Sequence, residues 1–225
     1  MRRREAASKS RRGLWRTEQE LRARGFANIA GVDEAGRGPL AGPVVAAAVM
    51  FPGRCRMPGL ADSKLLSAAQ RERLFELIQR RAVAIGVGLV NAQTVDRLNV
   101  LRAARLAMRQ AIAELGTRPD LVLVDGRGVP GVPVAQRAIV GGDRLCACIA
   151  AASIVAKVER DRIMGELDEQ YPDYGFGRHK GYATRDHLAC LRLLGPCPVH
   201  RRTFAPVRAA LQERLPLWGG SGGPP

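Results

Sequence analysis

Apolar positions along the chain predict a series of short strands. Runs rich in Val and Ala predict strands at residues 29–33 and 43–51, and an alternating pattern predicts a third at 82–90. Two brief apolar runs, at 121–124 and 138–140, predict two more. The run at 121–124 is continuous and leads into an Asp-Gly pair, which is typical of a buried strand that ends in a turn.

Stripes of apolar residues at helical spacing predict helices between and after these strands. One stripe, at 68–80, follows a capping-box sequence. A longer pattern covers 92–115, with a break expected near Asn99 and Gly116 as its C-terminal cap, and another covers 147–170. Strands followed by alternating helices and strands indicate an α/β fold, with a mixed sheet and helices on both faces.

The pattern divides the chain into three parts. Residues 1–27 are basic and lack strand patterning, so we expect a mobile tail, although 14–24 also fit a short basic helix. Residues 28–215 carry the predicted elements and form one domain with a helical C-terminal part, since a chain of this length can bury a single core. Residues 216–225 are rich in Gly and Pro, and we expect them to be disordered.

The composition favours a reduced, cytoplasmic protein. The longest apolar stretch, at 41–51, is about half the roughly 20 residues that a membrane span needs, so no membrane association is expected. The basic residues 1–12 are not followed by the apolar core of a signal peptide. The five cysteines are an odd number without a C-x-x-C pair, which is typical of buried thiols rather than disulfides.

The net charge of +15 lies mainly at the two ends of the chain. Residues 1–25 hold nine Lys and Arg against three Glu, and residues 176–225 hold eight against two acids. Such a distribution suits a polyanion such as nucleic acid, because each cation near a phosphate gains Coulomb energy and releases counterions. Codon bias or an unstructured basic tail would give the same excess, so the charge alone leaves both explanations open.

Four acidic residues occupy the ends of predicted strands. Asp33 and Glu34 close the first strand, Asp125 closes the fourth, and Asp143 follows the fifth after two glycines. An Asp before Gly at a strand end is usually a turn residue. Acids at three neighbouring strand ends, however, would repel one another unless cations bind. Oxygen ligands suit Mg²⁺ or Mn²⁺, so these acids in a basic protein indicate metal-assisted cleavage of a phosphodiester.

Two other kinds of site fit the sequence less well. The residues His179, His187, Cys190 and Cys197 match no ligand spacing of a zinc site. The sequence GVDEAGRG at 31–38 lacks both the Gly-Lys-Ser/Thr ending of a phosphate loop and the G-x-G-x-x-G spacing. Its glycines instead allow a ligand to approach the backbone closely, because glycine has no Cβ.

A series of short motifs follows one order along the chain. It opens with GVDEAGRGPLAGPVV at 31–45, and the further blocks are DSK (62–64), VDG (124–126), GD (142–143), AASIVAK (151–157), RD (160–161), HKGY (179–182) and HRRTF (200–204). This ordered series, which extends to about residue 207, resembles the motifs of bacterial type 2 ribonucleases H, the RNase HII family. The resemblance implies an RNase H-like fold, a five-stranded mixed sheet with helices on both faces and a helical C-terminal extension.

The resemblance also implies an activity. It implies an endonuclease that hydrolyses the RNA strand of RNA–DNA hybrids and cuts on the 5′ side of ribonucleotides embedded in duplex DNA. The reaction would use two divalent ions, Mn²⁺ or Mg²⁺, and leave 3′-OH and 5′-phosphate ends. The implied role is the removal of ribonucleotides from DNA, by a monomer whose partners are these duplexes.

Particular residues of this chain match the family's functional positions. The family's catalytic, metal-binding acids fall on Asp33, Glu34, Asp125 and Asp143. These are the same acids that stand at the predicted strand ends. The family's sensor of the ribonucleotide 2′-OH matches Gly36, Arg37 and Gly38, its phosphate-contacting lysine matches Lys64, and the tyrosine that packs on the sugar at the RNA–DNA junction matches Tyr182.

Simpler roles compete for several of these residues. Arg37 could be an ordinary surface cation, but its place between two glycines beside the acids favours contact with substrate. Tyr182 could be a half-buried core aromatic. His179 and Lys180 fit phosphate or structural contacts rather than catalysis. Asp161, which has an arginine on each side, fits a salt-bridged structural acid better than a fifth metal ligand.

Three other functions remain to be compared with this one. A type 3 ribonuclease H carries a sizeable N-terminal substrate-binding domain, and the roughly 28 residues before the first predicted strand are too few for it. A resolvase with the same fold would not need the glycine–arginine segment at 36–38 or the tyrosine motif. A non-catalytic nucleic-acid-binding protein would not keep four acids that repel phosphates.

Overall fold

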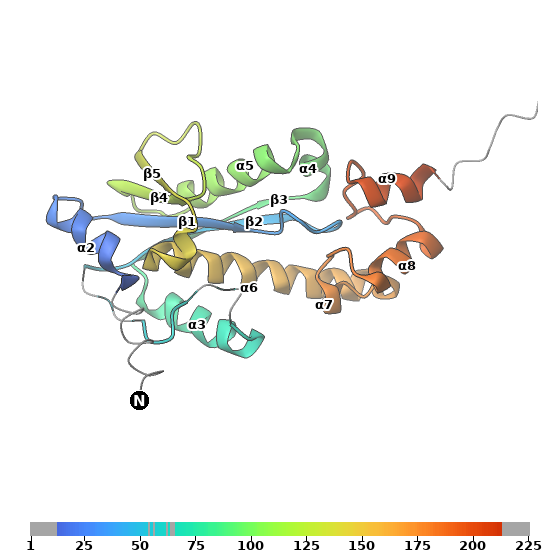
Figure 1. Ribbon diagram of the computed structural model, residues 1–225, viewed down its shortest axis with the longest axis horizontal. Helices are drawn as coiled ribbons and strands as arrows, with labels where there is room; N and C mark the ends of the chain where they lie inside the picture. The colour runs from blue at the N-terminus through green and yellow to red at the C-terminus, as the bar shows by residue number, and fades with distance from the viewer. Residues whose placement is uncertain (1–12, 54, 56, 62, 64–65, 213–225) are drawn as a thin grey trace, which may run out of the picture.

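A five-stranded mixed sheet lies at the centre of the computed structural model, which describes residues 13–212 except 54, 56, 62, 64 and 65 (Figure 1). The strand order is β3-β2-β1-β4-β5, with β1–β2 and β2–β3 antiparallel and β1–β4 and β4–β5 parallel. The strands are β1 Ile29–Ala35, β2 Val44–Met50, β3 Ala84–Val90, β4 Leu121–Asp125 and β5 Ala135–Ile139. The predicted sheet is therefore confirmed.

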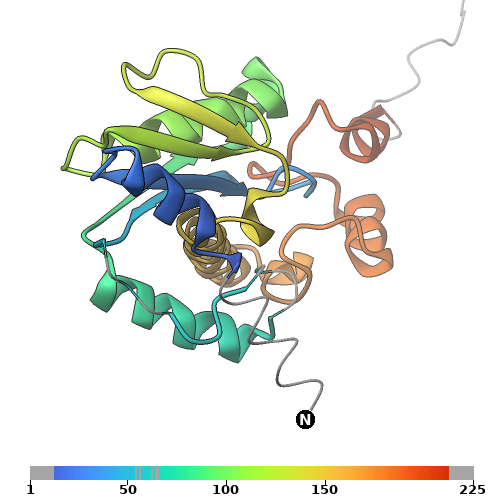
Figure 2. The same ribbon diagram turned by 60° about the vertical axis from the view of Figure 1, so that its left-hand side comes forward.

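Helices cover both faces of this sheet, as predicted (Figure 2). Helices α3 and α6 lie on one face and α5 lies on the other, while α7, α8 and α9 lie beyond the end of the sheet at which β1 ends (Figure 1). The α-helices are α2 Arg16–Ala23, α3 Ala68–Arg81, α4 Ala92–Leu98, α5 Val100–Ala113, α6 Ala147–Gln170, α7 Phe176–His179, α8 Arg185–Leu194 and α9 Ala205–Gln212. Short 3-10 helices are η2 Gly142–Arg144 and η3 Pro172–Tyr174.

Small residues allow the two main helices to pack closely on the sheet. Strand β2 is buried along its whole length, and its alternate residues enter two apolar clusters, one shared with α6 and the other with α5. Gly31 on β1 lies against α6, because a Cβ at this position would overlap the backbone of Cys148 and Ile149. Strand β1, which carries two of the predicted catalytic acids, is thus held rigidly between two layers of helices.

The longest predicted helices agree closely with the structure. Helix α6 has the predicted bounds of 147–170. The predicted break near Asn99 is confirmed: this residue has a φ of 66°, and its side chain accepts hydrogen bonds from the N–H groups of Leu101 and Arg102 at the start of α5. Of the helices that the structure describes, none is both long and apolar enough to cross a membrane.

The prediction for the fifth strand was wrong in its bounds. Strand β5 covers Ala135–Ile139 rather than residues 138–140. Its central residues Gln136 and Arg137 pair with β4, although they are polar. Because β5 is an edge strand with few buried side chains, it lacks the apolar run that identifies an inner strand.

The expectation that residues 1–27 form a tail outside the domain does not hold for the part that the structure describes. Helix α2 packs against the domain through the buried side chains of Leu14 and Leu21. Glu18 is 3% exposed, and its Oε1 accepts a hydrogen bond of 2.9 Å from the N–H of Cys148 in the first turn of α6. Residues 1–12 and 216–225, the rest of the predicted tails, lie outside the described residues.

We expect Glu18→Gln to make the stability of the protein less dependent on pH. Burial raises the pKa of Glu18, and the hydrogen bond from Cys148 offsets this only in part. A carboxyl group whose pKa is raised by folding contributes stability that is complete below its unfolded pKa and is lost as the pH rises through its folded pKa. The free energy of unfolding in urea should therefore fall less between pH 4 and pH 8 in Glu18→Gln than in the wild type. Equal falls would contradict this account.

Candidate active site

The predicted catalytic acids meet where β1 and β4 end side by side. These two strands are parallel, and the register that pairs Val32 with Val124 brings Asp33 and Asp125 to the same edge of the sheet. Asp33 is 6% exposed, and its Oδ1 accepts a 2.7 Å hydrogen bond from the N–H of Glu34. Two acids that are 92 positions apart in the sequence are therefore neighbours, as the strand-end argument predicted.

The short helix η2 brings the fourth acid to the same edge. Oδ1 of Asp125 accepts a hydrogen bond of 2.7 Å from the N–H of Gly142, which begins η2. The next residue, Asp143, is 3% exposed, and its Oδ1 lies 3.9 Å from Nε of Arg144. A Cβ at position 142 would lie 2.5 Å from Cδ1 of Ile149 in α6, so glycine allows η2 to pack closely between Asp125 and this helix.

The acids perturb one another electrostatically. Burial raises the pKa of Asp33 well above its ordinary value, and the negative charges of Glu34 and Asp125 raise it further. Hydrogen bonds from the N–H of Glu34 and from Ser153 oppose this rise. A cation bound among these acids would remove the repulsion, which is the electrostatic condition expected of a metal-binding cluster.

The carboxylates are gathered but do not adopt the geometry of a closed metal site. Within the described part of the chain, no group of three or more His, Cys, Asp or Glu side chains has an arrangement that could hold a metal ion. Each acid instead has its own partner: Glu34 pairs with Nη1 of Arg37 at 3.0 Å, and Asp125 accepts from Gly142. The oxygen-only donor set fits a hard divalent cation, and these side chains would have to turn toward one another to bind it.

Two buried arginines hold the glycine–arginine segment, residues 36–38, beside the acids. Arg201 is completely buried and donates to the carbonyl oxygens of Gly36 and Arg37 at 2.6 and 3.1 Å, and to those of Pro39 and Gly42 at 2.8 to 3.0 Å. Arg160 of α6 is also completely buried and donates to the carbonyl oxygens of Ala41 and Pro43. These bonds fix the backbone of the segment in one conformation.

Tyr182 lies next to the glycine–arginine segment. Its side chain is 45% exposed, and its Cε1 would lie 3.7 Å from a Cβ built on Gly38. The guanidinium carbon of Arg160 is 6.0 Å from the centre of the tyrosine ring. The structure therefore brings together the predicted sugar-contacting residues. Lys64, the predicted phosphate contact, lies outside the described residues.

Comparison with known proteins identifies the family. Residues 30–207 match the family profile of ribonuclease HII. The chain belongs to the ribonuclease HII family. The ribonuclease HII of Geobacter sulfurreducens is 52% identical to it over 200 residues, which cover 89% of this chain and 92% of that protein.

Two solved structures are similar to this ribonuclease HII chain. The ribonuclease H2 from Pyrococcus horikoshii OT3 has a TM-score of 0.70 and 28% identity, covering 83% of this chain and 98% of that one. Bst-RNase HIII in complex with Mn²⁺ has a TM-score of 0.64 and 18% identity, covering 84% and 70%. Because Bst-RNase HIII is only 18% identical to this chain, its similarity shows a shared fold and nothing further.

Membership of the ribonuclease HII family decides between the functions that the sequence left open. The chain is a ribonuclease H, a divalent-metal-dependent endonuclease that acts on RNA–DNA hybrids. The resemblance inferred from the sequence is confirmed. The alternatives of a non-catalytic nucleic-acid-binding protein, a resolvase and a type 3 enzyme are set aside, because the family profile and the related sequences are those of ribonuclease HII.

The sequence analysis missed the part played by Arg160 and Arg201 in this ribonuclease HII chain. Both stand in motifs that resemble the family, but neither the apolar pattern nor the charge distribution distinguishes a buried arginine from a surface one. The sequence did hold one sign of them. The Gly/Pro-rich segment after β1 has backbone carbonyl groups that need hydrogen-bond donors when they are buried, and arginine side chains can supply them. Asp161, by contrast, accepts from Nζ of Lys157 at 2.6 Å and lies 3.9 Å from Nη2 of Arg71, so it is a structural, salt-bridged acid.

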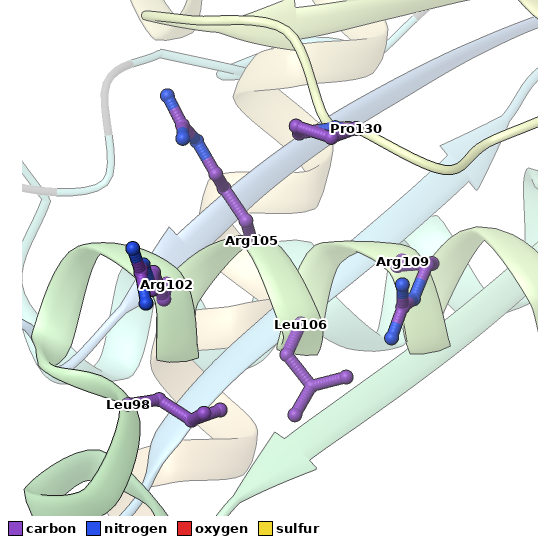
Figure 3. Close-up of a pocket in the computed structure, with 6 residues that line it drawn as sticks. All are labelled: Leu98, Arg102, Arg105, Leu106, Arg109 and Pro130. Atoms are coloured by element: carbon purple, nitrogen blue, oxygen red, sulfur yellow. The ribbon is translucent and has the colours of Figure 1, made fainter.

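A basic pocket lies apart from the acids of the ribonuclease HII site (Figure 3). It has a volume of about 310 Å³ and is lined by Leu98, Arg102, Arg105, Leu106, Arg109 and Pro130. The three arginines come from one side of α5, and Pro130 comes from the loop that follows β4 (Figure 3). This surface adds positive charge near the loop that begins at Asp125, in agreement with an anionic substrate.

Proposed function

We propose that this ribonuclease HII chain cuts duplex DNA on the 5′ side of single embedded ribonucleotides, in addition to the RNA strand of hybrids. The products would be 3′-OH and 5′-phosphate ends, and the role would be the removal of ribonucleotides from DNA. The observation that carries the proposal is the position of the Tyr182 ring next to Gly38, beside the strand-end acids. In this arrangement Gly38 and Tyr182 can both contact the sugar next to the bond that is cut.

The four strand-end acids are the proposed ligands of two divalent ions, Mg²⁺ or Mn²⁺. Support comes from the oxygen-only donor set and from the raised pKa of Asp33, which reflects its burial and then the negative charges of Glu34 and Asp125, a repulsion that a cation would relieve. The ions would activate a water molecule and stabilise the leaving oxygen of the phosphodiester. Asp33 and Asp125 come from rigid strand ends and would fix the position of the phosphate, while Glu34 would exchange its partner Arg37 for a ligand role.

The glycine–arginine segment is the proposed sensor of the 2′-OH. A 2′-OH donates and accepts hydrogen bonds, and it is the group that distinguishes RNA from DNA at a given sugar. Gly36 and Gly38 leave the backbone open to close approach, and the bonds from Arg201 keep that backbone from adjusting to a deoxyribose. Arg37 is free to move from Glu34 to a phosphate when substrate binds, and Lys64 is proposed as a second phosphate contact.

Tyr182→Ala is the experiment that tests this proposal. If the ring packs on the deoxyribose that follows the ribonucleotide, its loss should lower kcat/KM on a single embedded ribonucleotide by about tenfold or more relative to a continuous hybrid. Tyr182→Phe keeps the ring and is the matched control, so its ratio of the two kcat/KM values should stay near that of the wild type. A proportional loss on both substrates in Tyr182→Ala would mean that the ring serves packing only.

We also propose that the protein acts as a monomer in the cytoplasm. All five cysteines of the chain are free in the structure, which supports a reducing compartment. The proposed partners are nucleic-acid duplexes, either hybrids or DNA that contains ribonucleotides.

A further inference from the structure

All three histidines of the chain lie in one cluster next to Tyr182. The ring of His187 stacks on that of His179, with centroids 4.4 Å apart, and lies 5.2 Å from that of His200. The buried ring of Phe176 contacts all three histidines at centroid distances between 5.5 and 5.9 Å. His187 and His200 are buried and close together, which favours their neutral forms, since two positive charges would repel one another without solvent.

The backbone fixes where His200 and His187 carry their protons. The N–H of Cys197 donates to Nδ1 of His200 at 3.0 Å, so neutral His200 carries its proton on Nε2. That atom lies 3.0 Å from Nε2 of His187, which must therefore accept. Nδ1 of His187 then carries the proton and donates to the carbonyl oxygen of Tyr182 at 2.8 Å. We call these directed bonds, from Cys197 through His200 and His187 to Tyr182, the histidine chain.

The third histidine, His179, restrains the backbone of Tyr182 at its N–H group. The N–H of Gly181 donates to Nδ1 of His179 at 3.1 Å, so Nε2 carries the proton and donates to the carbonyl oxygen of Tyr174 at 2.7 Å. The carbonyl oxygen of His179 in turn accepts from the N–H of Tyr182 at 3.0 Å. The backbone of Tyr182 is thus held through both its N–H and its C=O.

Tyr182 depends on these bonds more than a core aromatic would. It follows Lys180 and Gly181, which both have positive φ values, 53° and 79°. Its ring is nearly half exposed and lies beside Gly38 and Arg160, so packing restrains it less than it would restrain a buried ring. Hydrogen bonds to its backbone therefore help to set where the ring lies, and its carbonyl oxygen accepts from both Nδ1 of His187 and the N–H of Thr184, each at 2.8 Å.

The histidine chain remains neutral at the pH at which most nucleases are assayed. Burial lowers the pKa of His187, and burial together with the neighbouring His187 lowers the pKa of His200 to about 4. A proton added to Nδ1 of His200 would face the N–H of Cys197 and would break the first bond of the chain. The direction of the hydrogen bonds is therefore a fixed property of the folded protein near pH 7.

We propose that His187 and His200 are positioning residues that hold Tyr182 against the glycine–arginine segment and so set the preference for a single embedded ribonucleotide over a continuous hybrid. The inference rests on the proposed junction role of Tyr182. His187 acts directly on the carbonyl group of Tyr182, and His200 acts by keeping the proton of His187 on Nδ1.

The first test observes the protons themselves in the intact, full-length protein. Nitrogen NMR of protein labelled with ¹⁵N-histidine at pH 7 distinguishes protonated from unprotonated ring nitrogens. We expect His187 and His200 to be neutral, with the proton on Nδ1 in His187 and on Nε2 in His200. A proton on Nδ1 of His200, or on Nε2 of His187, overturns the inference whatever the kinetics.

The second test compares two substitutions of His187. His187→Phe keeps a ring of similar size but has no donor, so the ratio of kcat/KM on a single ribonucleotide to kcat/KM on a hybrid should fall about three- to tenfold, the effect of one hydrogen bond. His187→Asn places an amide N–H where Nδ1 stood and should restore the ratio at least in part. Equal loss on both substrates in His187→Phe, with no rescue by Asn, overturns the inference.

The third test changes His200, which acts on Tyr182 through His187. His200→Phe removes the donor that fixes the proton of His187, and it should lower the same ratio. His200→Gln keeps an N–H at the position of Nε2 and should leave the ratio close to the wild-type value. If both variants behave alike, His200 is structural only and that part of the inference is overturned.

Tyr182→Ala, assayed in parallel, separates the inference from the function on which it rests. An unchanged ratio in Tyr182→Ala overturns the junction role, and with it the kinetic consequence of the histidine chain. A lowered ratio in Tyr182→Ala, together with an unchanged ratio in His187→Phe, leaves the junction role intact and overturns the positioning role.

Discussion

Asp33→Asn and Asp125→Asn should each reduce cleavage of both hybrids and single-ribonucleotide duplexes by far more than a hundredfold. Loss of a group that only orients a metal ligand already lowers activity about 10- to 100-fold. Asp33 and Asp125 are proposed as ligands themselves, so their loss should cost more. Single-turnover assays in Mg²⁺ and in Mn²⁺ measure the loss. Near-normal turnover of either variant in both ions would refute the assignment.

The same substitutions should not destabilise the fold in the absence of metal. The raised pKa of Asp33 means that its charged form is unfavourable in the folded state, so its replacement by a neutral amide relieves repulsion. Thermal melts in a chelator should therefore give a Tm equal to or above that of the wild type. Glu76→Gln, which removes an exposed ion pair on α3, is the matched control and should leave both activity and Tm unchanged.

Arg201→Met should lower the free energy of unfolding by about 3–5 kcal/mol and nearly abolish cleavage. Arg201 is fully buried and donates five hydrogen bonds to four carbonyl oxygens, so its loss leaves several buried acceptors without a partner. Burial lowers its pKa only to about 9, so it is still charged at neutral pH. Urea unfolding and kcat/KM on the hybrid measure the two effects.

Neighbouring and conservative substitutions separate the role of Arg201 from a general loss of charge. Arg202→Met changes an exposed arginine at the next position and should alter stability by less than about 0.5 kcal/mol. Arg201→Lys keeps the charge but has three donors on one nitrogen, so it should recover only part of the stability. Equal stability of Arg201→Met and Arg202→Met would show that the carbonyl contacts contribute little.

The sequence predicted the elements whose side chains follow a repeating pattern. The bounds of α6 and the break at Asn99 could be read from apolar periodicity and from capping chemistry. The positions of Asp33 and Asp125 followed from parallel strand ends, which meet at one edge of any such sheet. These features depend on local sequence and on the general geometry of α/β folds.

Features that depend on a few tertiary contacts could not be predicted in this way. Helix α2 was taken for part of a tail because it lies in the basic stretch 1–25, where Leu14 and Leu21, the two leucines that are buried against the domain, form no clear apolar stripe. Strand β5 lacks an apolar run because only one of its edges is paired. The five bonds of Arg201 depend on carbonyl groups about 160 residues away, which no pattern near Arg201 reveals.

The two buried arginines also bear on the order in which the protein assembles. Arg160 bonds to Pro43 across 117 positions, and Arg201 bonds to Gly36 across 165. Contacts between such distant positions form late, because a long loop must close first, and a chain is synthesised from its N-terminus. The glycine–arginine segment thus leaves the ribosome among the first parts of the domain but acquires its final shape only after residue 201 has emerged. A nascent chain therefore carries the acids proposed as metal ligands before the proposed sugar sensor has its final shape.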